Sequence, residues 1–160
     1  MSDPKPLRSP ALDPATVPLK ASTGYPEPFR AAVAGRARRR LGDALGLKNF
    51  GVNLTRLAPG AASAQRHWHT RQDEFVYVLE GEVVLVSDAG EQVLTPGMAA
   101  GFPAGKPDGH HLVNRSDRDA TYLEIGDRTE GDEVDYPDID MILRLREGKL
   151  RFLHKAGTPW

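Results

Sequence analysis

The stretch that decides the fold runs from Gln65 to Gly81 and reads QRHWHTRQDEFVYVLEG. One residue separates His67 from His69, and Glu74 follows after four more. Successive side chains of a β-strand point to opposite faces, so a strand would direct both imidazoles to the same side. The following residues, 75–79, are apolar at odd and even positions alike, which is typical of a strand covered on both faces.

A second histidine-containing stretch runs from Gly97 to Asn114 and reads GMAAGFPAGKPDGHHLVN. It contains the adjacent pair His110 and His111, so the two stretches hold four of the five histidines of the chain. Neighbouring residues of a strand face opposite sides, so at most one of this pair is expected to join the others. The fifth, His154, stands alone and is expected to pack or lie on the surface.

The two stretches resemble, in order, the two sequence motifs of the cupin superfamily. The first follows the spacing H-x-H, four residues, Glu, six residues, Gly, and the second follows Gly, five residues, P-x-G, then His, three residues, Asn. This chain has six rather than five residues between Gly60 and His67, and four rather than two between Gly105 and His110. The spacing to Asn114 favours His110 as the third histidine of the family motif, and His111 stays open as the alternative.

The resemblance covers residues 50–126 and implies an all-β double-stranded β-helix, the cupin jelly-roll barrel. It also implies one divalent metal ion, bound by His67, His69, Glu74 and His110. Such a nitrogen and oxygen set suits Fe, Mn, Ni, Co, Cu or Zn better than Ca or Mg. With a dication bound, the site would carry a charge of about +1 and would attract a small, anionic or chelating ligand.

Cupins perform many different reactions, so three functions remain open. The arrangement of the chain is similar to small bacterial single-domain cupins described as candidate sugar-phosphate isomerases. A non-haem metal dioxygenase and a non-catalytic sensor that binds a metal or ligand are the alternatives.

An isomerase requires a base beside the metal, and Tyr122 and Glu124 share one face of a predicted strand. Strand alternation, however, favours the reverse orientation, with Leu123 and Ile125 inside the barrel. Cations for a substrate phosphate lie near the motifs, although each is more typical of a surface charge: Lys106, Arg56 and Arg66. Apolar walls for a dioxygenase would come from Phe102, Met98 and Trp68.

A chain of 160 residues with 39% hydrophobic and 27% charged residues fits one globular domain. Its 16 glycines and 13 prolines favour short strands joined by turns. The absence of cysteine excludes disulfides and thiolate ligands. Strands are predicted at 49–57, 64–69, 74–79, 82–87, 91–94, 98–102, 110–114 and 121–125, followed by 139–145 and 149–154.

Three parts are expected: a proline-rich arm and loop at 1–48, the barrel core at 49–126, and C-terminal strands with a tail at 127–160. The first 28 residues contain seven prolines, which excludes a regular helix there. The basic run of Arg36, Arg38, Arg39 and Arg40 is predicted to be a solvated loop that pairs with the acidic segment 130–135, and a contact to nucleic acid or phosphate is the alternative.

The predicted partners are a small-molecule ligand or substrate and a second copy of the chain. A homodimer is expected because two apolar strands and the arm leave surface that a monomer would have difficulty covering. The formal net charge of −1 gives no overall attraction to nucleic acid. Without a signal peptide or an apolar run of roughly 18 residues, no membrane association is predicted, and the expected location is the cytoplasm.

Overall fold

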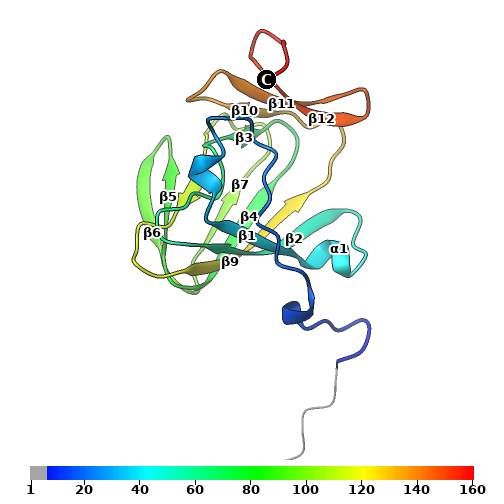
Figure 1. Ribbon diagram of the computed structural model, residues 1–160, viewed down its shortest axis with the longest axis vertical. Helices are drawn as coiled ribbons and strands as arrows, with labels where there is room; N and C mark the ends of the chain where they lie inside the picture. Colours follow the sequence, from blue (N-terminus) through cyan, green and yellow to red (C-terminus); the bar gives the residue numbers. More distant parts are fainter. Residues whose placement is uncertain (1–6) are drawn as a thin grey trace, which may run out of the picture.

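The computed structural model describes residues 7–160, in which β-strands predominate (Figure 1). In chain order the strands are β1 (Arg36–Arg40), β2 (Phe50–Leu57), β3 (Trp68–His69), β4 (Glu74–Glu80), β5 (Val83–Ser87), β6 (Gly90–Leu94), β7 (Ala99–Phe102), β8 (His111–Val113), β9 (Ala120–Asp127), β10 (Val134–Tyr136), β11 (Met141–Arg146) and β12 (Lys149–Leu153). Helical structure in these residues is limited to α1 (Leu41–Ala44) and two 3₁₀ turns, η1 (Pro14–Thr16) and η2 (Ala31–Val33).

Two antiparallel sheets form the walls of the barrel. One has the strand order β1-β2-β9-β4-β7 and the other the order β6-β5-β8. The core lies between them, where Val76, Val78 and Tyr122 of the first sheet pack with Val83 and Leu85 of the second. The all-β jelly-roll prediction is confirmed, because both sheets bury one face against the other.

A third sheet, of order β12-β11-β10-β3, closes one end of the barrel. Figure 1 shows its three C-terminal strands stacked above the barrel, next to β3. A second apolar cluster holds this end together and joins Tyr25 of the arm to Val33, Tyr136 and Met141. The arm and the C-terminal strands therefore cover the end of the barrel that carries His69.

The basic run 36–40 is a strand, so the prediction of a solvated loop is wrong. All five residues pair with β2, and Arg36 and Ala37 are buried. The predicted pairing with the acidic segment 130–135 is also wrong, because Arg38 forms its salt bridge with Glu124. Alternation places Arg36, Arg38 and Arg40 on the barrel side of the strand. The loop prediction was wrong because it assumed that the interior of the barrel is apolar.

The arm is held against this strand. The backbone of Lys20 exchanges two hydrogen bonds with that of Arg38, at 2.9 and 2.8 Å. The sequence-based expectations for residues 1–6 lie outside the described residues. The predicted strand at 64–69 is reduced to Trp68–His69, with an isolated bridge between His67 and His110.

Gly81, which ends the first motif, lies in a position that only glycine occupies without strain. Its φ is +69°, and a Cβ there would lie 2.6 Å from the carbonyl oxygen of Asp119. The motif glycine therefore allows the turn after β4 to pass close to the start of β9.

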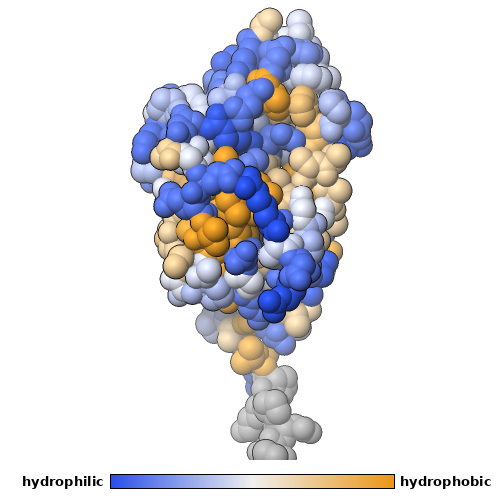
Figure 2. All heavy atoms as spheres, turned by 90° about the vertical axis from the view of Figure 1, so that its left-hand side faces the viewer, coloured by the Kyte–Doolittle hydropathy of each residue, from blue (hydrophilic) through white to orange (hydrophobic). Residues whose placement is uncertain are grey.

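The surface beside β5 and β6 combines a hydrophobic patch with a hydrophilic border (Figure 2). No helix among residues 7–160 has the length and apolar character needed to cross a membrane.

Candidate metal centre and cavity

Three imidazoles converge on one carboxylate oxygen at the covered end of the barrel. The Nε2 atoms of His67, His69 and His110 lie 3.5, 3.4 and 2.9 Å from Oε2 of Glu74. The donor atoms of His67, His69 and Glu74 all lie within 4.8 Å of one another. The H-x-H spacing produces this arrangement because both histidines leave the β3 segment on the same side.

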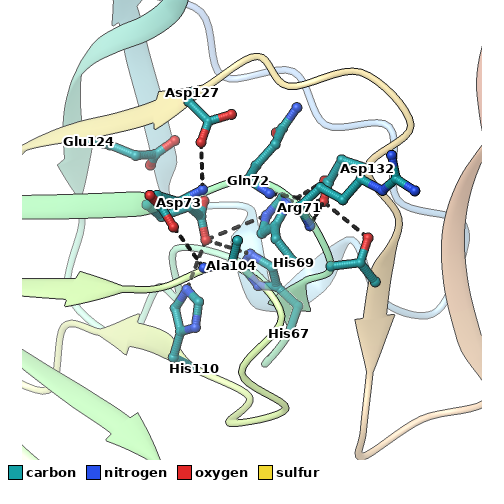
Figure 3. A network of polar contacts seen from close by, with 12 residues as sticks. His67, His69, Arg71, Gln72, Asp73, Ala104, His110, Glu124, Asp127 and Asp132 are labelled. Atoms are coloured by element: carbon teal, nitrogen blue, oxygen red, sulfur yellow. Dashed lines mark hydrogen bonds and ion pairs between the residues drawn. The ribbon is translucent and has the colours of Figure 1, made fainter.

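The outer nitrogens of two imidazoles are fixed by hydrogen bonds. Nδ1 of His67 lies 2.9 Å from the carbonyl oxygen of Gln65, and Nδ1 of His69 lies 2.6 Å from Oδ2 of Asp132 (Figure 3). Each contact turns the Nε2 atom of that ring toward Glu74. Such bonds at the far nitrogen set the orientation and tautomer of a metal-ligating histidine.

The protonation states follow from this crowding. Burial alone would raise the pKa of the Glu74 carboxyl, but hydrogen bonds from His110, His67 and His69 hold it well below its ordinary value. Burial alone would lower the pKa of His69, but Glu74 and Asp132 outweigh it and raise the pKa to about 9. For His110, the hydrogen bond to Glu74 does not outweigh the effect of burial, so the pKa of this imidazole is lowered.

The donor set of His67, His69 and Glu74 fits a transition metal, whereas His110 contacts Glu74 but lies outside the group whose donor atoms are all within 4.8 Å of one another. Metal–nitrogen and metal–oxygen bonds of about 2.0–2.2 Å place neighbouring ligands roughly 3.0–3.5 Å apart. The three distances to Glu74 Oε2 fall in or next to this range. Nε2 of His110 faces Glu74, whereas its Nδ1 lies on the other side of the ring and is buried without a hydrogen-bond partner among residues 7–160.

His110 and His111 differ in what they contact. His110 reaches Glu74, whereas Nδ1 of His111 lies 2.9 Å from the carbonyl oxygen of Ala64. Both line the interior cavity, so the expectation that only one of them would do so is wrong. Strict alternation does not apply here, because β8 begins at His111 and His110 precedes it.

The cluster opens into a cavity of about 280 Å³ inside the barrel. Tyr122 and Glu124 line it, so the expectation that Leu123 and Ile125 would point inward is wrong. Register decides the matter: Glu124 pairs with the buried Val76, and Tyr122 pairs with the buried Val78. The inward-facing side chains of β9 are therefore polar where this strand lines the cavity.

Comparisons with known proteins agree with this architecture. The model of the cupin domain matches residues 53–126. A sugar phosphate isomerase of the cupin superfamily from Silicibacter pomeroyi, whose crystal structure is known, is 48% identical to this chain. The match covers 94% of this chain and 96% of that one, with a TM-score of 0.90. The chain belongs to the cupin superfamily.

Two further structures share this cupin fold. A candidate sugar phosphate isomerase from Acidithiobacillus ferrooxidans is 32% identical over 79% of this chain and 82% of that one, with a TM-score of 0.71. The polyketide cyclase RemF from Streptomyces resistomycificus is 22% identical over 73% of this chain and 78% of that one, with a TM-score of 0.61, and shows likeness of fold alone. No curated protein matches the chain.

The cations inside this cupin barrel are not those expected from the motifs. Arg56 pairs with Asp119 on the surface, Lys106 lies beside Asp108 in an exposed loop, and Arg66 is bound by Asp88 and Asp138. The residues that line the cavity are instead Arg36 and Arg38 of β1. Their alternation with Ala37 was the signal that could have identified them.

The expected apolar walls divide in the same way. Phe102 lines the cavity and stacks on His110, with ring centroids 3.5 Å apart. Trp68 lines a smaller cavity of about 40 Å³, which His69, Glu74 and His110 line as well. Met98 is exposed and lines neither cavity. His154 stacks on Trp160 and bonds to Asp140, as its isolated position suggested.

Asp132 is one residue of the candidate site that sequence reasoning missed. It lies in the acidic segment and contacts His69 across 63 positions of sequence. It also accepts hydrogen bonds from the backbone N–H groups of Arg71 and Gln72, at 2.8 and 3.2 Å. No local pattern marks such a contact.

Proposed function

We propose that this cupin is a metal-dependent enzyme that isomerises a small anionic substrate by moving a proton between adjacent carbons. The observation that carries the proposal is a carboxylate, Glu124, which lines the same cavity as the histidine cluster. The similarity to a sugar phosphate isomerase at 48% identity supports the same reaction class.

His67, His69, Glu74 and His110 would hold the metal. A bound divalent ion would supply a Lewis acid that polarises a carbonyl or hydroxyl oxygen of the substrate. The four donors leave room for oxygen ligands if the ion is six-coordinate, which distinguishes a catalytic site from a closed structural one.

Glu124 is positioned to act as the base. It lies two residues along the interior face from the Glu74 row, because Glu74 pairs with Gly126 and Val76 pairs with Glu124. That offset is about 7 Å along the strands. Arg38 and the Asn53 amide hydrogen-bond its two oxygens, at 3.1 and 3.3 Å, and so fix the orientation of the carboxylate.

Glu124 alone can both remove and return the proton that moves between the two carbons. Glu124 takes a proton from the carbon next to a carbonyl group and returns it to the adjacent carbon, while a second proton moves between the two substrate oxygens. The reaction needs no oxidant and no second substrate.

The metal assignment is tested by elemental analysis of protein purified without a chelator. The His67→Ala, His69→Ala double variant is expected to lose the metal. His154→Ala, which removes a histidine outside the cluster, is expected to retain it. Equal metal content in all three proteins would contradict the assignment.

The reaction is tested on metal-exchanged protein. With zinc or manganese and without oxygen, the enzyme is expected to interconvert aldose and ketose phosphates from a panel, and Glu124→Gln is expected to lower kcat by about 10²–10⁴-fold. Oxygen consumption by the iron(II) protein with catechols or diketones, in the absence of isomerisation, would establish the dioxygenase instead. Inactivity in both assays would contradict both enzymatic functions and favour the non-catalytic sensor.

A further inference from the structure

The deeper wall of the cavity contains polar groups that the proposed reaction does not use. Three of them come from neighbouring strands at or near one level of the barrel: Arg38 of β1 pairs with Thr55 of β2, and Thr55 pairs with Tyr122 of β9. Arg36 lies one interior position further along β1. All but Thr55 line the same cavity as Glu124 and the histidines.

These groups have hydrogen-bonding capacity that the protein leaves unused. Nε of Arg38, the hydroxyl of Tyr122 and Oγ1 of Thr55 are buried and have no partner among residues 7–160. Tyr122 and Thr55 are both fully inaccessible to solvent. A buried polar atom without a partner is costly, and such atoms are few in native proteins.

The missing partner must be an acceptor. A guanidinium N–H can only donate, so Nε of Arg38 cannot be satisfied by another donor. The two hydroxyls can donate as well. Two of these donors, Arg38 Nε and the Tyr122 hydroxyl, belong to residues that line the cavity, and they favour a ligand group with several acceptor oxygens over a cationic one.

The charges point to an anion. Glu124 neutralises Arg38, and Glu74 is held by the three imidazoles. Arg36 is 7% exposed and forms no salt bridge within the part of the chain that the structure describes; its Nη1 donates to the carbonyl oxygen of Ser63. Burial lowers the pKa of Arg36, because a buried positive charge that is not paired with a negative charge is unfavourable. Water would supply acceptors but would not offset this charge.

We propose that Arg36, Nε of Arg38 and the Tyr122 hydroxyl form an oxyanion subsite that binds the phosphate or carboxylate group of the substrate. This inference rests on the proposed function, because it places the charged end of the substrate beyond Glu124 and its reacting end at the histidine cluster. The volume of about 280 Å³ lies near the lower end of the range for small-molecule sites, roughly 300–1,000 Å³, and limits the ligand to a compact metabolite.

The test is calorimetric titration of the full chain with inorganic phosphate and, separately, with acetate. The two titrations distinguish a phosphate from a carboxylate ligand. Arg36→Gln is expected to weaken binding of the preferred anion by about 10- to 100-fold, as for the loss of a charged hydrogen-bond donor. The matched control is Arg56→Gln, which removes the same charge from the opposite face of the same sheet and is expected to bind normally.

A second variant protects the test against misfolding of Arg36→Gln. Tyr122→Phe removes only a hydroxyl that has no hydrogen-bond partner among the described residues, so the free protein is expected to be at least as stable as the wild type while anion affinity falls about 3- to 10-fold. The subsite is overturned if neither anion binds, or if Tyr122→Phe binds as tightly as the wild type.

The His67→Ala, His69→Ala variant separates this inference from the metal proposal. Anion binding retained in that variant assigns the anion to the arginines, whatever the metal content. Anion binding lost in that variant but unchanged in Arg36→Gln would place the anion at the histidine cluster and would overturn the subsite.

Discussion

Asp132 controls the orientation of one imidazole of the cluster. Its Oδ2 contacts Nδ1 of His69, while its Oδ1 accepts the N–H groups of Arg71 and Gln72. Side chains with this role behind a metal ligand typically contribute 10- to 100-fold to metal affinity. The loop geometry and the histidine orientation thus depend on different oxygens of one carboxylate.

Asp132→Asn is expected to lower zinc affinity by about 10- to 100-fold. The asparagine oxygen still accepts the two backbone N–H groups, so the thermal midpoint is expected to change little. Competition with a chelating dye measures the affinity. Asp135→Asn, which loses only a 3.9 Å contact with Lys155, is the control. Equal affinities in the two variants would mean that Asp132 serves the loop alone.

At the residue level, the sequence was sufficient where function depends on local spacing. His67, His69 and Glu74 come together because strand alternation and a short turn are both local properties. Asp132 and Arg36 were missed because their contacts, with His69 and Ser63, join segments 63 and 27 positions apart. Only the register between distant strands brings such residues together.

Among the elements, Asn114 joins the end of β8 to β2. Its side chain is fully buried, donates to the carbonyl oxygens of Leu57 and Arg118 at 2.8 and 2.7 Å, and accepts from the Ser116 N–H at 3.0 Å. The last residue of the second motif thus links the strand to the turn that follows it. None of these contacts involves the histidine cluster.

Asn114→Ala is expected to lower the free energy of unfolding by about 2–4 kcal/mol, because it removes the buried hydrogen bond to the Leu57 carbonyl oxygen together with the bonds to Arg118 and Ser116. Urea denaturation measures the change. Ser116→Ala, which removes a hydroxyl near the surface, is expected to cost less than about 1 kcal/mol. A loss of metal from Asn114→Ala without any loss of stability would contradict this structural role.

The elements that sequence analysis missed share one property. Strands β1 and β10 are too short for an apolar pattern to be recognised in the sequence: β1 is an edge strand with four arginines, and β10 has three residues, two of which, Val134 and Tyr136, belong to the second apolar cluster. Leu123 and Ile125 were expected to point inward because apolar residues were assumed to face the interior of the barrel. Hydrophobic patterning identifies the interior only where it is apolar, and this barrel places charged groups around a cavity.

For the whole molecule, the outer face of the five-stranded sheet bears on the predicted homodimer. Register places Val52, Ile125 and Phe75 in one row across this face. The next row contains Leu54, Leu123 and Tyr77. Phe75, Tyr77 and Leu79 are 41%, 37% and 39% exposed, although each lies on a central strand. Within residues 7–160, neither the arm nor the third sheet covers these side chains, so their apolar surface is exposed in the part of the chain that the structure describes.

Because contiguous apolar surface of this kind marks association sites, the protein is expected to sediment as a dimer at micromolar concentration. Tyr77→Glu would bury an unpaired charge in the interface and is expected to weaken self-association on the order of 100-fold. Leu150→Glu, at a position that is 65% exposed on β12, is expected to leave the dimer intact. A monomeric wild type would refute the dimer, and dissociation by Leu150→Glu alone would move the interface to the C-terminal strands.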